Sequence, residues 1–227
     1  MTMLHLIAGL MPKSAPISYT YNGSASNDTA GSTITLTGVA IGAAASGRLV
    51  VMAVSYGGTF GGNLTSATIG GISATVYSGT SYSNGGDDTV SGFIAAVVPT
   101  GTTATVVLTF SSSTPCAAVA SYSIFNYVST TPFSGPTRVT GASQSARSGA
   151  VSTANPCVVL AVVGGRSSTA TCTWTGGVTE DADFRYASNT AVFSAASARI
   201  TSADGLTATS TMTASILAIV LSVITFQ

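Results

Sequence analysis

Charge is scarce in this sequence of 227 residues: only 6% are charged, and seven acidic and seven basic side chains give a formal net charge of zero. Ordinary soluble proteins carry about 25% charged residues, and net charge keeps many of them apart in solution. This chain lacks that protection, so we expect a protein that packs against partners. Nucleic acid is not an expected partner, because phosphate binding requires clustered positive charge, and the six arginines and Lys13 are scattered.

Histidine and cysteine are also scarce, which argues against several kinds of active site. His5 is the single histidine, so neither a Ser-His-Asp arrangement nor a His-based metal site is expected. We therefore predict no enzymatic activity and no cofactor. Cys116, Cys157 and Cys172 are interpreted as small buried residues. A disulfide between the last two remains an alternative if the Gly-Gly pair at 164–165 forms a hairpin turn.

The carboxylates gather in two short segments. Asp87 and Asp88 lie in SNGGDDT, and Glu180, Asp181 and Asp183 lie in TEDADFR, next to an arginine. The simplest interpretation is that these acids are solvated residues of turns. The alternatives are a calcium site formed by Glu180, Asp181 and Asp183 and, as the weakest, a pair of carboxylates for glycoside hydrolysis.

Aromatic side chains offer a second kind of ligand contact. Tyr82 and Trp174 lie close in sequence to the two acidic segments, and Tyr82, Asp87, Asp88 and Trp174 form a candidate ligand loop for a sugar. Aromatic residues in β proteins more often pack in the core or in cross-strand pairs. The core interpretation is preferred, and the sugar-binding interpretation stays open.

Helical periodicity is almost absent, and short apolar or alternating runs recur between Gly, Ser, Thr, Asn and Pro. The many β-branched residues suit a pleated surface. Strands are predicted at 33–39, 48–56, 66–77, 90–98, 103–110 and 117–126. The predicted fold class is therefore all-β, an antiparallel and jelly-roll-like β-sandwich.

The second half of the chain repeats the plan of the first. VVMAVSYGG at 50–58 returns as VVLAVVGGR at 158–166, IGGIS at 69–73 returns as TGGVT at 175–179, and YSIF at 122–125 is answered by LSVI at 221–224. We therefore predict that the sandwich is built from two pseudo-repeated halves, at about 33–127 and 139–227.

The predicted domain organisation is an N-terminal arm over 1–16 and one sandwich over 17–227. Prolines and glycines mark most of 127–149, between the two halves, as irregular connection. The segment 215–226 is apolar on both faces, which places it in the middle of a larger assembly of strands. Two tandem domains are the alternative to one sandwich.

The apolar segment MLHLIAGLMP at 3–12 is unlike a secretory signal, because its positive charge, Lys13, follows the apolar run instead of preceding it. The other long apolar segment, 215–226, has 12 residues, which is too few for a membrane helix of about 20 residues. We expect the segment at 3–12 to be held against a neighbour, and the sequence leaves three neighbours open: its own sandwich, another copy of the chain or a different protein. The side chains expected to make this contact, each worth about 1.5–3 kcal/mol when buried, are Leu4, Leu6, Ile7, Leu10 and Met11.

Three motifs follow one another between residues 66 and 126: SATIGGISATVYSG, GFIAAVVPTGTTATVVLTFSSS and CAAVASYSIFN. This order resembles poorly characterised proteins encoded in the structural gene clusters of tailed bacteriophages and prophages. The second half resembles them more faintly, at TWTGGVTED. Because the motifs are strand and turn patterns, no functional residue is carried over. The resemblance implies a virion component, such as a head decoration protein, a head fibre or a tail protein.

The expected function is therefore structural: a part of a phage particle that is assembled in the host bacterial cytoplasm and docks on capsid or tail proteins through its N-terminal arm and strand edges. We expect a homo-oligomer, a trimer by analogy with decoration proteins, with no membrane span. The alternative is a carbohydrate-binding or host-adsorption module of a virion or secreted protein, with a host-surface glycan as its partner. A secreted hydrolase is the weakest hypothesis.

Overall fold

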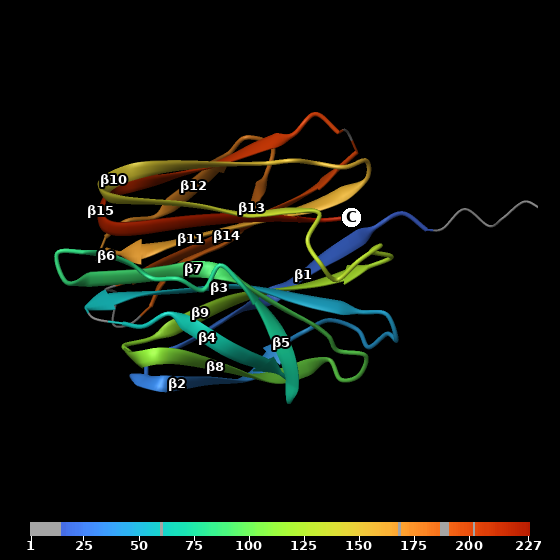
Figure 1. Ribbon diagram of the computed structural model, residues 1–227, viewed down its shortest axis with the longest axis horizontal. Coiled ribbons are helices and arrows are strands. Elements are labelled where there is room, and N and C mark those ends of the chain that lie inside the picture. The colour runs from blue at the N-terminus through green and yellow to red at the C-terminus, as the bar shows by residue number, and fades with distance from the viewer. Residues whose placement is uncertain (1–14, 60, 168, 187–190, 202) are drawn as a thin grey trace, which may run out of the picture.

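The computed structural model describes residues 15–59, 61–167, 169–186, 191–201 and 203–227. Within these residues every strand pairing is antiparallel, and the strands form two sheets that lie one against the other (Figure 1). The prediction of an all-β antiparallel protein is confirmed. Each half of the chain supplies one sheet, the first with strands from Ser18 to Phe125 and the second with strands from Ser134 to Phe226.

The first sheet has nine strands and curls until its two ends meet. They are β1 (Ser18–Asn27), β2 (Gly31–Ala40), β3 (Leu49–Thr59), β4 (Leu64–Ile69), β5 (Ile72–Tyr77), β6 (Tyr82–Asn84), β7 (Asp87–Val97), β8 (Thr103–Thr114) and β9 (Ala117–Phe125). Their order is β1-β9-β3-β7-β5-β4-β8-β2, with β6 paired to β7. The end strands β1 and β2 contact each other, so the sheet forms a nearly closed barrel with an interior of its own.

The second sheet has six strands, two of them long. They are β10 (Ser134–Val151), β11 (Cys157–Arg166), β12 (Cys172–Thr175), β13 (Thr179–Tyr186), β14 (Ala191–Ile200) and β15 (Leu206–Phe226). Their order is β10-β15-β11-β14-β13, with β12 paired to β15. The two ends of β15 have different neighbours. Its N-terminal part pairs with the end of β10 and with β12, and its C-terminal part pairs with the start of β10 and with β11.

The segment 66–77, predicted as a single strand, is instead a hairpin, which corrects that prediction. Gly70 and Gly71 form the turn between β4 and β5, with φ of 61° and 79°. Positive φ at both positions gives the turn type that matches the twist of antiparallel strands, and glycine adopts it without steric cost. Gly176 and Gly177, between β12 and β13, have φ of 84° and 89°.

The segment 127–149 contains most of β10, so the prediction that it is mostly irregular is wrong. Pro136 is tolerated because β10 is an edge strand, in which only one side of the backbone pairs, and the register shifts near it, between Ser134 and Thr137. The placement predicted for 215–226 is confirmed, since this part of β15 pairs with both β10 and β11 and is buried from Ala218 to Phe226.

Buried side chains form three clusters. One fills the interior of the first sheet, one fills the interior of the second, and the third lies between the sheets. On β3, Val50, Met52 and Val54 face the first interior, whereas Leu49, Val51 and Ala53 face the second sheet. A strand with a core on each face must be apolar at successive positions, which explains the uninterrupted apolar run.

Glycines let the two sheets approach closely. A Cβ on Gly57 would lie 2.6 Å from the carbonyl oxygen of Gly165, and a Cβ on Gly164 would lie 1.7 Å from the Oγ of Ser55. Gly164 and Gly165 therefore lie inside β11, where it packs on β3, and do not form the hairpin turn considered for a disulfide. The Oγ of Ser55 donates to the carbonyl oxygen of Val90 at 2.7 Å.

Arg48, just before β3, ties down two loops at one end of the first sheet. Its side chain is fully buried. Its five N–H groups donate, at 2.7–3.0 Å, to the backbone carbonyl oxygens of Gly42, Ala43, Val98, Thr100 and Gly101. A guanidinium group has five donors in a fixed plane, and all five are satisfied here.

Candidate functional site

The arm residues predicted to contact a partner lie outside the described residues, which begin at Ala15. These residues are Leu4, Leu6, Ile7, Leu10 and Met11. His5 also lies outside the described residues. The first segment that the structure does describe, residues 15–17, enters β1 along a surface groove at the junction of the two halves.

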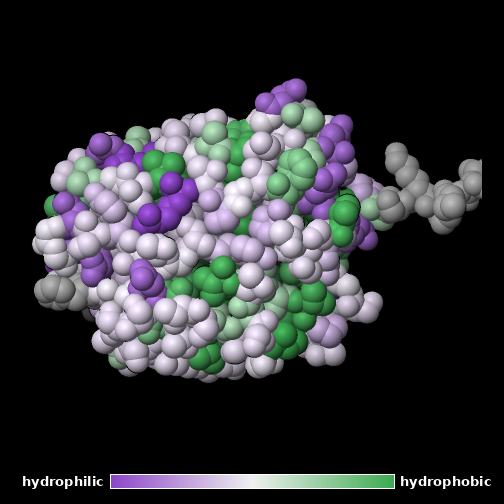
Figure 2. Space-filling model, in the orientation of Figure 1, coloured by the Kyte–Doolittle hydropathy of each residue, from purple (hydrophilic) through white to green (hydrophobic). Residues whose placement is uncertain are grey.

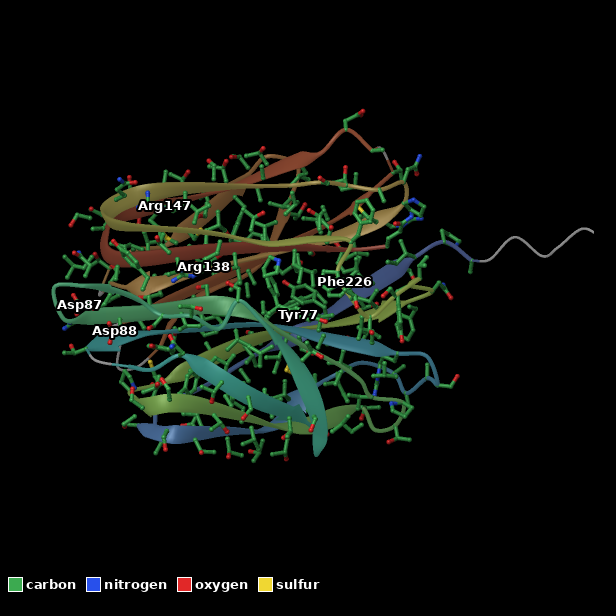
Figure 3. All side chains as sticks on the ribbon, in the orientation of Figure 1. Tyr77, Asp87, Asp88, Arg138, Arg147 and Phe226 are labelled. Carbon is green, nitrogen blue, oxygen red and sulfur yellow. The ribbon has the colours of Figure 1, made fainter. Side chains whose placement is uncertain are left out.

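The acidic part of the predicted ligand loop contributes to the fold. Asp87 is buried and forms an ion pair with Arg166 of the second sheet. The Oδ2 of Asp88 accepts a hydrogen bond from the backbone N–H of Gly61 at 2.8 Å. Figure 3 shows both aspartates at one end of the molecule, at the start of β7. Asp87 thus links the two halves of the chain.

The two aromatic members of the predicted loop lie in different sheets. Tyr82 is half-buried on β6 of the first sheet. Trp174 lies on β12 of the second sheet, where it packs against the interior cluster and its Nε1–H donates to the Oγ of Ser194 at 2.7 Å. Trp174 therefore packs at the edge of the buried cluster inside the second sheet.

The acids at 180–183 lie along β13, and two of them accept hydrogen bonds from the fold. Tyr122 donates its hydroxyl to the Oδ2 of Asp181 at 2.9 Å, and the backbone N–H of Cys172 donates to the Oδ2 of Asp183 at 3.0 Å. Burial raises the pKa of Glu180, Asp181 and Asp183. Among the described residues, no group of three or more His, Cys, Asp or Glu side chains is placed to hold a metal ion.

A cluster of three tyrosines lies next to Asp181, and of these the sequence singles out only Tyr122, as one of the tyrosines that could stack on a sugar. Tyr19 and Tyr21 of β1 pack against Tyr122, with ring centroids 6.5 and 5.5 Å from its own. The Oγ of Ser197 donates to the hydroxyl of Tyr19 at 3.0 Å. Burial, followed by the nearby charge of Asp181, raises the pKa of Tyr122. This cluster joins β1 of the first sheet to β13 and β14 of the second.

All three cysteines are buried free thiols. Burial raises the pKa of Cys116 and of Cys172 to about 12 and also raises the pKa of Cys157. A thiol is nucleophilic only as the thiolate. These cysteines are therefore packing residues, as the main interpretation of the sequence predicts.

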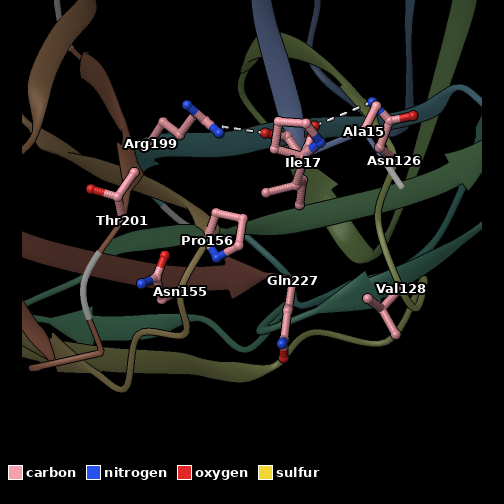
Figure 4. Close-up of a pocket in the computed structure, with 10 residues that line it drawn as sticks. Ala15, Ile17, Asn126, Val128, Asn155, Pro156, Arg199, Thr201 and Gln227 are labelled. Atoms are coloured by element: carbon pink, nitrogen blue, oxygen red, sulfur yellow. Dashed lines mark hydrogen bonds between the residues drawn. The ribbon is translucent and has the colours of Figure 1, made fainter. Parts of the chain in front are cut away.

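One surface cavity has both polar and apolar lining, and we call it the junction groove. We define it by segments 15–17, 126–128, 155–156 and 199–201 together with Gln227 (Figure 4). Its cavity measures about 360 Å³. The segments come from both halves of the chain and lie where β1 begins and where β9, β14 and β15 end. Sequence reasoning missed the groove because no local pattern brings these segments together.

Two side chains of the groove already bind an extended piece of backbone. The Nε–H of Arg199 donates to the carbonyl oxygen of Ile17 at 2.9 Å, and the Nδ2–H of Asn126 donates to that of Pro16 at 3.2 Å (Figure 4). On the opposite wall the N–H of Val128 donates to the carbonyl oxygen of Gln227 at 2.6 Å. The groove is thus built to hold a chain segment by its carbonyl groups.

Several large apolar side chains are exposed on the described surface. Val128, in the wall of the groove, is 82% exposed, and Leu217 of β15 is 50% exposed. Phe133, Ile72 and Val97 are also exposed. Figure 2 shows apolar side chains gathered around β5 on the face that it presents.

No family model matches this chain, and neither a curated protein nor a solved structure matches it. Within the ranges that the structure describes, no helix has the length and hydropathy needed to cross a membrane.

Proposed function

We propose that this protein is a non-enzymatic structural component of a phage particle, which decorates the head or forms part of a fibre or tail. One observation carries the proposal: the described side chains best suited to chemistry are engaged in holding the fold together. Asp87 pairs with Arg166, Asp181 accepts from Tyr122, and the cysteines are buried. The order of strand motifs, which resembles that of phage structural proteins, supports the same class.

The proposal includes a jelly-roll-like sandwich of two pseudo-repeated halves, and the neighbours of each strand support it. In the first sheet, β8 lies between β2 and β4, and β9 lies between β1 and β3. In the second sheet, the N-terminal part of β15 lies between β10 and β12, as β8 lies between β2 and β4. The C-terminal part of β15 lies between β10 and β11, as β9 lies between β1 and β3.

Docking would use the arm over 1–16 and an exposed strand edge. In the described structure β10 pairs along one side only, because it ends the strand order of the second sheet. An unpaired edge presents a row of N–H and C=O groups that can pair with a strand of another chain. The partners are further copies of this chain and capsid or tail proteins.

Particles purified from a bacterial host that carries this chain with its neighbouring genes test the proposal. Mass spectrometry should detect the intact chain in the particles. A chain that lacks residues 2–12 should fold, as judged by circular dichroism, but be lost from them. Leu217→Ser, which changes one exposed side chain, is the control and should be incorporated. Absence of the intact chain, or normal incorporation of the truncated chain, would contradict the proposal.

A carbohydrate-binding module is the second candidate, and the tyrosine cluster favours it. Tyr19 and Tyr21 are half-buried on β1, with Asp181 and its hydroxyl partners close by. Aromatic faces with a few placed polar groups are common in ligand sites. A glycan array tests this candidate: binding that Tyr21→Ala removes and Trp174→Phe retains would support it, and an array without any bound glycan would count against it.

A further inference from the structure

We propose that the junction groove receives the apolar segment at residues 3–11 of a second copy of this chain. The inference rests on the proposed function, because it names the site at which the arm of an assembling protein docks. It concerns contacts between copies only, so it can be tested separately from incorporation into particles.

The size and lining of the groove suit a short apolar peptide. Its cavity measures about 360 Å³, the size of a small-ligand pocket, so it would take a few side chains of the segment and the rest would lie on the surface beside it. Val128 and Pro156 supply apolar surface, and Val128 is 82% exposed. Asn155 and Gln227 also line the cavity, and a side-chain amide can both donate to and accept from a peptide backbone.

The groove also shows how such a peptide would be held. Arg199 and Asn126 already bind the carbonyl oxygens of Ile17 and Pro16. The segment 15–17 is thus a bound chain in place, and a second extended segment can lie beside it along the open side of the cavity. Apolar side chains on that segment would cover Val128, which otherwise remains exposed to water.

The segment at 3–11 is the occupant that the chain itself offers. It carries five large aliphatic or thioether side chains that the sequence predicts to be contact residues, and it contains no Asp, Glu, Lys or Arg. An uncharged peptide suits a groove in which the described charge is the guanidinium group of Arg199, already bound to Ile17.

The position of the segment favours a groove on another copy over the groove of the same chain. Ala15 and Pro16 form part of the wall, and the prolines at 12 and 16 bias the residue before each of them towards an extended conformation. This bias disfavours the tight reversal that would return the segment to the groove of its own chain. The 14 residues before Ala15 can span up to about 45 Å, which is enough to reach a neighbour.

Such a contact is heterologous, since an arm on one copy meets a groove on the next. Heterologous contacts either close into rings or continue as filaments. The trimer expected for a decoration protein is one such ring.

The experiment uses the full chain and two complementary variants. Val128→Glu keeps the arm and blocks the groove, whereas the double variant Leu6→Asp, Leu10→Asp keeps the groove and blocks the arm. Sedimentation velocity should show oligomers of the unmodified chain and at least about tenfold weaker association of each variant alone. When mixed, the two variants should form a 1:1 complex, because one intact arm meets one intact groove.

Leu217→Glu is the matched control, because it also places a charge at an exposed apolar position. The backbone carbonyl oxygen of Leu217, which is exposed, accepts a hydrogen bond from Asn84, and Asn84 pairs with Asp87. Leu217 therefore lies at the Asp87 end of the molecule, away from the groove. This variant should associate like the unmodified chain, and circular dichroism should show that all variants fold.

Two results would overturn the inference. One is a mixture of the two variants that stays monomeric. The other is a monomeric unmodified chain whose arm becomes sensitive to protease only after Val128→Glu, since this result would place the arm in its own groove. A chain that stays monomeric yet enters particles refutes the inference and leaves the proposed function standing. A chain that assembles through the groove but is absent from particles refutes the proposed function and leaves this inference standing.

Discussion

Replacing Arg48 with lysine should destabilise this protein far more than an exchange of two basic residues usually does. An ammonium group has three donors and a guanidinium group has five, so at least two of the carbonyl groups that Arg48 binds would lose their partner. A hydrogen bond to a charged group contributes about 1.5–3 kcal/mol, and the Arg48 side chain is fully buried. The expected loss is therefore about 3 kcal/mol or more, out of the about 5–15 kcal/mol that is typical of a domain.

Arg147→Lys is the matched control for this prediction. Arg147 is a second buried arginine, only 7% exposed, whose Nη1–H donates to the carbonyl oxygen of Ala146. A lysine can keep that bond, so the free energy of unfolding should fall by less than about 1 kcal/mol. Urea unfolding followed by circular dichroism measures both variants. Similar losses for the two would refute the idea that the five carbonyl bonds make Arg48 special.

The same experiment tests whether the halves unfold together. Arg48 lies in the first half, and Trp174, the single tryptophan, lies in the second. Because a core of large apolar side chains joins the sheets, Arg48→Lys should lower the unfolding midpoint seen by tryptophan fluorescence as much as that seen by circular dichroism. An unchanged fluorescence midpoint would show that the halves unfold independently.

Two further changes probe the contacts between the halves. Gly164→Ala would place a Cβ 1.7 Å from the Oγ of Ser55, so it should reduce the free energy of unfolding by about 1–3 kcal/mol, whereas Gly47→Ala, with no atom within 4 Å of its Cβ, should change it little. Burial raises the pKa of Asp181 above 3.8, so the folded chain holds this proton more tightly than the unfolded chain, and stability should rise as the pH falls from neutral towards 4. Asp181→Asn should reduce that rise in urea titrations at pH 7 and pH 4.5, and an unchanged or larger rise would contradict the assignment.

The sequence predicts most strands of the first half because apolar runs end at clear turn residues, but it cannot fix which side chains face which core. An alignment of the two repeats by their sequence pairs Val50 with Val158. In the structure, Val50 faces the interior of the first sheet, whereas Val158 faces the core between the sheets. Alternation normally encodes the buried face of a strand. A strand buried on both faces has no alternation, so its register depends on neighbours that the sequence does not reveal.

The contacts of the candidate site residues were harder to predict than the strands, because they join residues that are far apart in the sequence. Asp87 and Arg166 are 79 positions apart, and Tyr122 and Asp181 are 59 apart. Acids in turn-like segments look solvated until a distant partner is known. The polar strand β10 was missed for a related reason, since Pro136 normally marks a break and only an edge position tolerates it.

The two halves handle their strand edges differently, and this difference directs how copies can meet. The first sheet brings β1 against β2 and so protects its own edges. The second sheet leaves the outer side of β10 unpaired, but Pro136 removes one N–H from that edge, and Arg138 adds a positive charge to the same strand. Both features hinder unselective strand pairing. A chain with no net charge cannot rely on charge repulsion to prevent aggregation. Selective contact between copies must therefore come from complementary shape, which the proposed docking of the apolar arm in the junction groove would supply.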